Sequence, residues 1–147
     1  MNSDGSNVTR LTKDDEVAFY NPEWSPDGRM LVFYAEKGDA KDQIWTINAD
    51  GTSPRLLTNN IGHNIFPAFS PNGKKIIYSS NLGGEHGGVF TMNLDGTEVE
   101  QLKGIKTGWI RYSPDGKKIV YVEGRFPNSS IIIANADGSN PKKIVGD

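Results

Sequence analysis

The residues best suited to chemistry lie in loops of variable length between short apolar runs. The two histidines, His63 and His86, could pair in a metal or acid–base site, although solvated loop histidines are the interpretation that we favour. The run Asp14, Asp15 and Glu16 could bind a cation or a basic peptide. A solvated acidic loop explains the same run more simply. These loops are therefore candidate binding elements.

Sequence motifs of common enzyme classes are missing from the chain. It has no Gly-x-Ser-x-Gly nucleophile motif, no His-Glu-x-x-His zinc motif and no dinucleotide fingerprint. It also has no cysteine, which excludes thiolate metal sites, cysteine catalysis and disulfides. We predict that the chain is not an enzyme and has no catalytic residue, no cofactor and no metal site. A carboxylate-based lyase or hydrolase leaves no local signature, so that alternative stays open.

Two short motifs recur along the chain and reveal its organisation. The first is Ser-Pro-Asp-Gly or Ser-Pro-Asn-Gly, beginning at Ser25, Ser70 and Ser113. The second is Asp-Gly, beginning at Asp4, Asp50, Asp95 and Asp137, each followed seven residues later by Leu11, Leu57, Leu102 or Ile144. Matching spacing in two independent signals predicts a repeat protein. The Asp-Gly motifs resemble calcium loops only superficially, and we expect their Asx side chains to close turns.

Each repeat predicts four short β-strands. An aromatic residue ends the first strand just before the Ser-Pro turn. The second strands, 31–33, 76–78 and 119–121, are continuous apolar runs, so we expect both faces of these strands to be covered. The third strands, 44–47, 89–92 and 131–134, end at an Asn before the Asp-Gly turn, and a short polar fourth strand follows. The chain is therefore predicted to be all-β, built from four-stranded antiparallel β-propeller blades.

The repeat resembles the TolB-like β-propeller repeat family over nearly the whole chain. The likeness rests on an aromatic residue followed by Ser-Pro-Asp-Gly, on Ile44-Trp45 followed by Asn48 and Asp-Gly, and on a final Leu-Thr. TolB is a periplasmic component of the Tol-Pal system, so the resemblance implies a protein-binding module in the periplasm or outside the cell. Similar blades also occur in propeller domains of prolyl-oligopeptidase-like enzymes and in surface proteins.

The phase of the repeats predicts an incomplete propeller. Residues 1–12 correspond to the end of a third strand and a fourth strand, followed by blades at 13–58, 59–103 and 104–147. Three blades cannot close a ring, because propellers have roughly four to eight. Dimerisation would give a six-bladed ring, in which either the first or the last fourth strand completes the final blade. Alternatively, the chain is a piece of a longer propeller.

Strand order places the variable loops on one face of the predicted disc. That face collects the candidate binding residues, which are Asp14, Asp15, Glu16, His63, Asn81, Glu85, His86, Trp109 and Arg125. Variable loops on a rigid scaffold are the usual location of binding sites. Trp109 stands where the other repeats have Asn21 and Phe66, so it could line a ligand pocket or pack in an interface.

We therefore predict a non-enzymatic binding or scaffold module that engages a protein or peptide through its variable-loop face or its central channel and self-associates to complete its ring. The alternatives are a self-assembling fragment without a ligand, and a propeller region detached from a hydrolase or glycan-active enzyme. A net charge of −2 with dispersed Lys and Arg predicts no nucleic-acid partner. No apolar run is long enough for membrane insertion, and residues 1–12 show no signal-peptide pattern.

Overall fold

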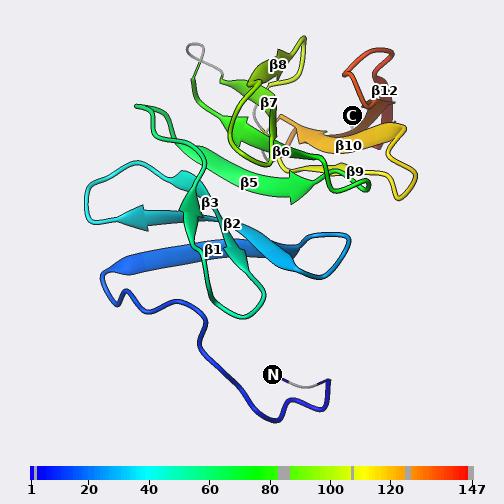
Figure 1. Cartoon of the computed structure of the whole chain (residues 1–147). Coiled ribbons are helices and arrows are strands. Elements are labelled where there is room, and N and C mark those ends of the chain that lie inside the picture. Colours follow the sequence, from blue (N-terminus) through cyan, green and yellow to red (C-terminus); the bar gives the residue numbers. More distant parts are fainter. Residues whose placement is uncertain (2, 83–86, 107, 125–126, 146–147) are drawn as a thin grey trace.

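The computed structural model describes all residues except 2, 83–86, 107, 125–126 and 146–147. It contains three four-stranded antiparallel sheets, each built from four consecutive strands of the chain. The sheets follow one another as blades of a partial propeller (Figure 1). The predicted all-β blade architecture is therefore confirmed. Among the described residues, no helix is long and apolar enough to cross a membrane.

The three sheets are called blades 1, 2 and 3. Blade 1 contains β1 (Val17–Trp24), β2 (Met30–Lys37), β3 (Gln43–Asn48) and β4 (Arg55–Leu56). Blade 2 contains β5 (Asn64–Phe69), β6 (Lys75–Ser80), β7 (Gly88–Asn93) and β8 (Glu100–Leu102). Blade 3 contains β9 (Ile110–Tyr112), β10 (Lys118–Glu123), β11 (Ser130–Asn135) and β12 (Lys142–Val145).

The Ser-Pro turns join the first and second strands of each blade through the same hydrogen bonds. In blade 1 the Ser25 hydroxyl donates to Asp27 Oδ1 at 2.6 Å and accepts from the Met30 amide at 2.9 Å. Blades 2 and 3 repeat both bonds, with Ser70 and Ser113 as the serines. The serine thus closes the hairpin from inside, while Gly28 adopts the positive φ of 71° that the turn requires.

The Asp-Gly turns join the third and fourth strands. Asp50 Oδ1 accepts hydrogen bonds from the Thr52 amide and hydroxyl, while Asn48 Nδ2 donates to the same hydroxyl at 2.9 Å. Blades 2 and 3 contain equivalent Asn, Asp and Thr or Ser contacts. The predicted role of the Asx side chains in closing these turns is confirmed, and it explains why an Asn ends each third strand.

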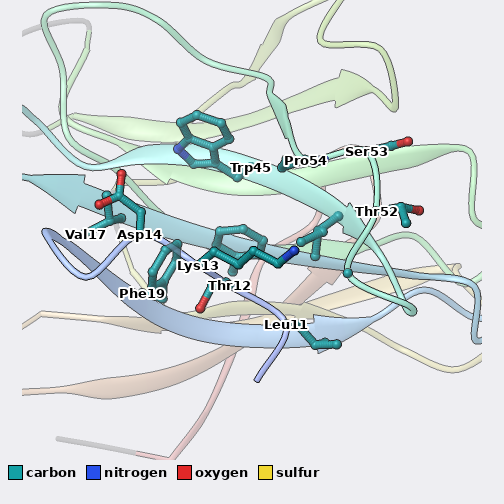
Figure 2. Close-up of a pocket in the computed structure, with 13 residues that line it drawn as sticks. Leu11, Thr12, Lys13, Asp14, Val17, Phe19, Trp45, Thr52, Ser53 and Pro54 are labelled. Atoms are coloured by element: carbon teal, nitrogen blue, oxygen red, sulfur yellow. The ribbon is translucent and has the colours of Figure 1, made fainter. Parts of the chain in front are cut away.

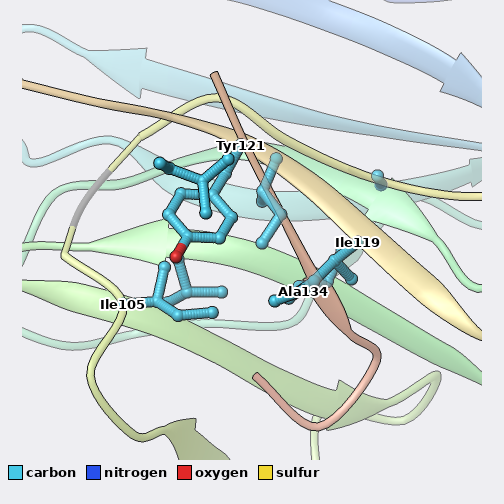
Figure 3. Packing of buried hydrophobic residues seen from close by; sticks show 9 residues of the cluster. Ile105, Ile119, Tyr121 and Ala134 are labelled. Atoms are coloured by element: carbon cyan, nitrogen blue, oxygen red, sulfur yellow. The ribbon is translucent and has the colours of Figure 1, made fainter. Parts of the chain in front are cut away.

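Two apolar clusters fill the spaces between neighbouring blades. One lies between blades 1 and 2 and includes Val32, Ile76 and Tyr78. The other lies between blades 2 and 3 and includes Ile119 and Tyr121, which Figure 3 shows from close by. The core of the protein is therefore divided into layers that run between the sheets.

Burial differs sharply between the second strands of blades 2 and 3. In β6 every residue after Lys75 is buried, as the continuous apolar run predicted. In β10 burial alternates, so that Ile119 and Tyr121 face blade 2 while Val120 and Val122 are exposed. The expectation that both faces are covered thus holds for blade 2 and fails for blade 3. The physical reason is that no described segment covers the outer face of blade 3.

We predict that two isoleucines of blade 3 differ strongly in their contribution to stability. Ile119 is fully buried and Ile131 is 41% exposed. Replacing Ile119 with Ala should cost about 2–5 kcal/mol of unfolding free energy, because it opens a cavity between blades 2 and 3. Ile131→Ala should cost less than about 1 kcal/mol in dilute protein. Urea denaturation measures both, and equal losses would contradict the layered core.

Candidate functional site

Four aromatic side chains form a row at the inner strands of the three blades. Tyr20 stacks on Tyr34 with ring centroids 5.1 Å apart, and Tyr34 meets the edge of Phe66 at 5.9 Å. Phe66 in turn stacks on Trp109 at 6.0 Å. We call these residues the aromatic row. β1 provides Tyr20, β2 provides Tyr34 and β5 provides Phe66, and Trp109 lies just before β9, so the row extends from blade 1 to blade 3.

Irregular backbone holds part of this row in place. The register between β1 and β2 shifts between Tyr20 and Glu23, and Asn21 there has a φ of 50°. The register between β5 and β6 shifts in the same way, and Phe66 has a φ of 55°. A bulky residue in the left-handed region is uncommon and marks a turn, a bulge or a strained position. Such bulges re-aim side chains, and here they occur at equivalent positions of two repeats.

An ion pair joins the first blade to the third beside the aromatic row. Arg111 Nε lies 3.0 Å from Glu23 Oε2, and both side chains are about one-third exposed. The other carboxylate oxygen of Glu23 accepts a hydrogen bond from the Phe69 amide. The Arg111 guanidinium also lies 5.7 Å from the centre of the Trp109 ring. Glu23 therefore contacts the inner strands of blades 2 and 3 and orients the Arg111 side chain next to an exposed Trp.

Burial raises the pKa of Glu23 above its usual value of 4.5. The Arg111 guanidinium and the Phe69 amide lower the same pKa, but burial is the larger effect. Ionisation of Glu23 therefore costs more free energy in the folded protein than it does in water. A charged group retained at such a cost is a feature of functional sites, although structural networks show it too.

Sequence reasoning missed this ion pair, but the repeat contains a signal for it. Glu23, Ala68 and Arg111 each precede the serine of the Ser-Pro turn by two residues. Glu23 and Arg111 carry opposite charges at equivalent positions of blades 1 and 3. Ala68 is the equivalent residue of blade 2, and its small side chain leaves room for the two charged side chains to meet. Tyr20 and Tyr34 were likewise missed as members of a row.

His63 and Asn81, both predicted for the loop face, lie together at the junction of blades 1 and 2. The Asn81 side chain accepts a hydrogen bond from the His63 amide at 2.7 Å. His63 Nδ1 lies 2.6 Å from Asp42 Oδ2, a partner that the sequence analysis did not select. Behind them, fully buried Asn64 donates to Gln43 Oε1 and Asn60 Oδ1. This network fixes the shape of the loop between β4 and β5.

The acidic loop is neutralised largely by the chain itself. Asp14 and Glu16 lie 3.1 Å and 3.3 Å from the Lys37 ammonium, and Asp15 pairs with Arg10. A hydrogen bond from the Glu16 amide lowers the pKa of Asp14, and Lys37 lowers it further. These contacts support a structural role for the loop, and its use in binding stays a prediction.

The remaining predicted positions have separate outcomes. Trp109 is 56% exposed and ends the aromatic row. Glu85, His86 and Arg125 lie outside the described residues. Within the described part of the chain, no group of three His, Cys, Asp or Glu side chains is placed to hold a metal ion. The structure therefore brings together His63 with Asn81, and places Trp109 beside Arg111.

A cavity of about 570 Å³ lies on the outer face of blade 1 (Figure 2). Its apolar lining includes Phe19, Phe33, Trp45 and Ile47 from β1, β2 and β3. The segment before β1 passes over this face and contributes Leu11 to the same lining. Polar side chains line it as well, namely Thr12, Lys13, Asp14, Thr52 and Ser53, so the cavity is a gap of mixed character between a sheet face and a chain segment.

We predict that the unfolding free energy of Glu23→Gln, relative to that of the unmodified protein, rises between acidic and neutral pH. Because the folded-state pKa of Glu23 is raised, its contribution favours folding below 4.5 and is lost as the pH rises through the folded value. Gln does not ionise, so the unfolding free energy of the variant lacks this decrease with pH. The difference between the variant and the unmodified protein should therefore shift in favour of the variant from acidic to neutral pH. Urea denaturation at several pH values tests this. Arg111→Met should show the opposite trend, and parallel curves for all three proteins would contradict it.

Comparison with known proteins places these features in a family. A family model described as the TolB beta propeller domain matches residues 1–146. Among solved structures, a protein assigned as TolB from Agrobacterium tumefaciens has 25% identity and a TM-score of 0.78, over 90% of this chain and 50% of the other. TolB from Acinetobacter baumannii has 23% identity and a TM-score of 0.77, over 92% and 34%.

An enzyme also contains this fold. A puromycin hydrolase has 19% identity and a TM-score of 0.79, over 97% of this chain and 24% of the hydrolase. At that identity the likeness shows the fold alone. The chain spans half or less of the length of the two TolB structures that it matches. Because the family model covers almost every residue, this chain belongs to the TolB beta propeller domain family.

Proposed function

We propose that this chain is a non-enzymatic binding and scaffold module, which engages a protein or peptide through its aromatic row and completes its ring with a second copy. Both parts rest on side chains of the described residues. The binding part rests on Trp109 and Arg111. The assembly part rests on the apolar outer faces of blades 1 and 3.

The observation that carries the binding proposal is an exposed Trp, just before β9, beside an Arg of β9 that Glu23 orients. Trp and Arg are the residue types that most often dominate protein–protein binding energy. Glu23 holds the Arg111 guanidinium in one place, which lowers the entropy lost when a partner binds. Phe66 stacks on the Trp109 ring and restricts its orientation. The site is therefore preorganised for a flat or extended partner.

The chemistry of the site favours a peptide with an apolar or aromatic anchor next to an acidic group. The anchor would stack on Trp109, where the aromatic row continues toward blade 1. The acidic group would pair with the Arg111 guanidinium, which can bind a carboxylate through two parallel hydrogen bonds. Glu23 would keep its contact with Arg111 Nε, so the partner's carboxylate would approach the Nη atoms of the guanidinium.

We predict that Trp109→Ala abolishes binding of peptides selected from a displayed random library on the unmodified protein. Trp24→Ala is the matched control, because Trp24 is 58% exposed but belongs to the end of β1. Affinity for each selected peptide is measured by calorimetry, and Arg111→Ala should weaken the peptides that contain Asp or Glu. Failure to enrich any peptide, or equal binding to the Trp109 variant, would contradict the proposal.

Apolar side chains on the outer faces of blades 1 and 3 support the assembly proposal. On blade 3, Val120, Val122, Ile131 and Ile133 are 36–41% exposed and lie on adjacent strands β10 and β11. On blade 1 the opposite outer face contains Phe19 and Trp45 beside the cavity. Contiguous apolar faces of this kind mark association surfaces. Stacking the two faces would extend the arrangement that already joins blades 1, 2 and 3.

We predict that the protein forms a dimer of twice its 16.1 kDa mass and that Val122→Glu makes it monomeric. A charge on the outer face of blade 3 would have to be desolvated in the interface, which is costly. Lys74→Glu, at the exposed turn before β6, is the control and should leave the dimer intact. Light scattering over a range of concentrations measures the mass. A monomer at every concentration would contradict the assembly proposal.

A further inference from the structure

The segment before β1 and the segment before β12 contain the same four-residue turn. Residues 4–7 and 137–140 are both Asp-Gly-Ser-Asn. Gly5 and Gly138 have φ angles of 82° and 85°, and Asn7 and Asn140 have 53° and 51°. In both turns the aspartate Oδ1 accepts a hydrogen bond of 2.9 Å from the serine amide. The first segment is therefore already folded as the turn that leads into a fourth strand.

Leu11 lies where the fourth strand of a preceding blade would lie. A side chain at Gly96, in the Asp-Gly turn of blade 2, would meet the Leu57 carbonyl oxygen of blade 1. A side chain at Gly51 would meet the Leu11 carbonyl oxygen in the same way, at 3.2 Å. At Gly138 the equivalent contact shifts by one residue to the Lys103 oxygen, at 3.5 Å. The contact between successive blades is thus repeated by the segment before blade 1.

This segment nevertheless pairs with no described strand. Residues 8–12 belong to none of the described ladders, and Val8 is 77% exposed. A fourth strand needs a third strand beside it to satisfy its backbone groups. Residues 8–12 therefore have the position of a blade's last strand, and no described strand pairs with them.

At the other end of the described chain, β12 is a fourth strand with little cover. All four residues of β12 are exposed, and its pairing with β11 shifts register between Ile131 and Ile132. Pro141, just before β12, cannot donate a backbone hydrogen bond. The residue equivalent to Leu11 is Ile144, which is half exposed because no Asp-Gly turn of a further blade is packed against it. β12 is thus the weakest-held strand of blade 3.

We propose that two copies of this chain associate by exchanging these strands. Residues 4–12 of one copy pair with β11 of the other, in the place of β12, while Leu11 keeps its contact with Gly51. The proposal rests on the self-association described above and names its route. The exchange replaces one fourth strand by a segment with the same turn and seven-residue spacing. At position 8 the incoming strand supplies an amide that Pro141 lacks.

A second copy fits this place because it continues an interface already present twice within the chain. The outer face of blade 3 would pack on the outer face of blade 1 of the partner, as each blade packs on the next. Each copy gives one strand and receives one, so the contact is symmetric and closes. Both apolar outer faces are covered, and the ring has six blades, within the usual range.

Cysteine trapping tests the exchange, since the chain has no cysteine of its own. In β11, Ile133 faces Lys142 and Ile132 faces Lys143. The seven-residue correspondence replaces Lys142 with Thr9, so exchange places Thr9 of one copy opposite Ile133 of the other. A mixture of Thr9→Cys and Ile133→Cys proteins should therefore form a covalent dimer on mild oxidation. Facing residues of antiparallel strands are close enough for a disulfide.

Two controls make the outcome decisive. A chain with both Lys142→Cys and Ile133→Cys should oxidise within itself, which locks β12 in place and shows that position 133 is competent. The mixture of Thr9→Cys with Lys74→Cys should not cross-link, because Lys74 lies at a turn outside β11. A dimer by light scattering without the Thr9–Ile133 cross-link would overturn the exchange alone. A monomer throughout would overturn both the exchange and the self-association beneath it.

Discussion

The structure depends on one constraint, which is that each sheet has two apolar faces and needs a neighbour on both. Blade 2 meets this requirement, and its central strand β6 is buried along almost its entire length. Blade 3 meets it on one side only, which leaves Val120 exposed, and the outer face of blade 1 is covered in part by the segment before β1, with Phe33 and Ile47 buried there. Since apolar burial is the main source of stability, the outer blades are held less strongly than the middle one.

The same two turns recur in all three blades, so each blade presents its apolar faces to its neighbours in the same way. Each Ser-Pro turn and each Asp-Gly turn is closed by its own side chains, so the geometry of the turn does not depend on the neighbouring blades. Contacts between blades then reduce to matching apolar layers and a close backbone approach at Gly51 and Gly96. A glycine is needed at both places because a Cβ would press on the carbonyl oxygen of the preceding leucine, and because both have a φ of 82°.

Sequence alone predicted the features that are encoded within one repeat. The hairpins follow from Ser25 and Asp27 and their counterparts, and the three-sheet architecture follows from the spacing of those motifs. The Glu23–Arg111 pair could not be predicted in this way, because it joins residues of two blades across a third. The left-handed backbone at Phe66 was equally hidden, since no local rule places an aromatic residue there.

The binding proposal and the assembly proposal share a physical link through blade 3. Trp109 and Arg111 belong to this blade, whose outer face is uncovered and whose last strand is fully exposed. Covering that face would restrict the motions of β9 and β10, which flank the site. A partner bound between Trp109 and the inner strands of blades 1 and 2 would in turn hold blade 3 against them. Because such coupling is reciprocal, any ligand that favours the closed ring must bind more tightly to the assembled protein than to the single chain.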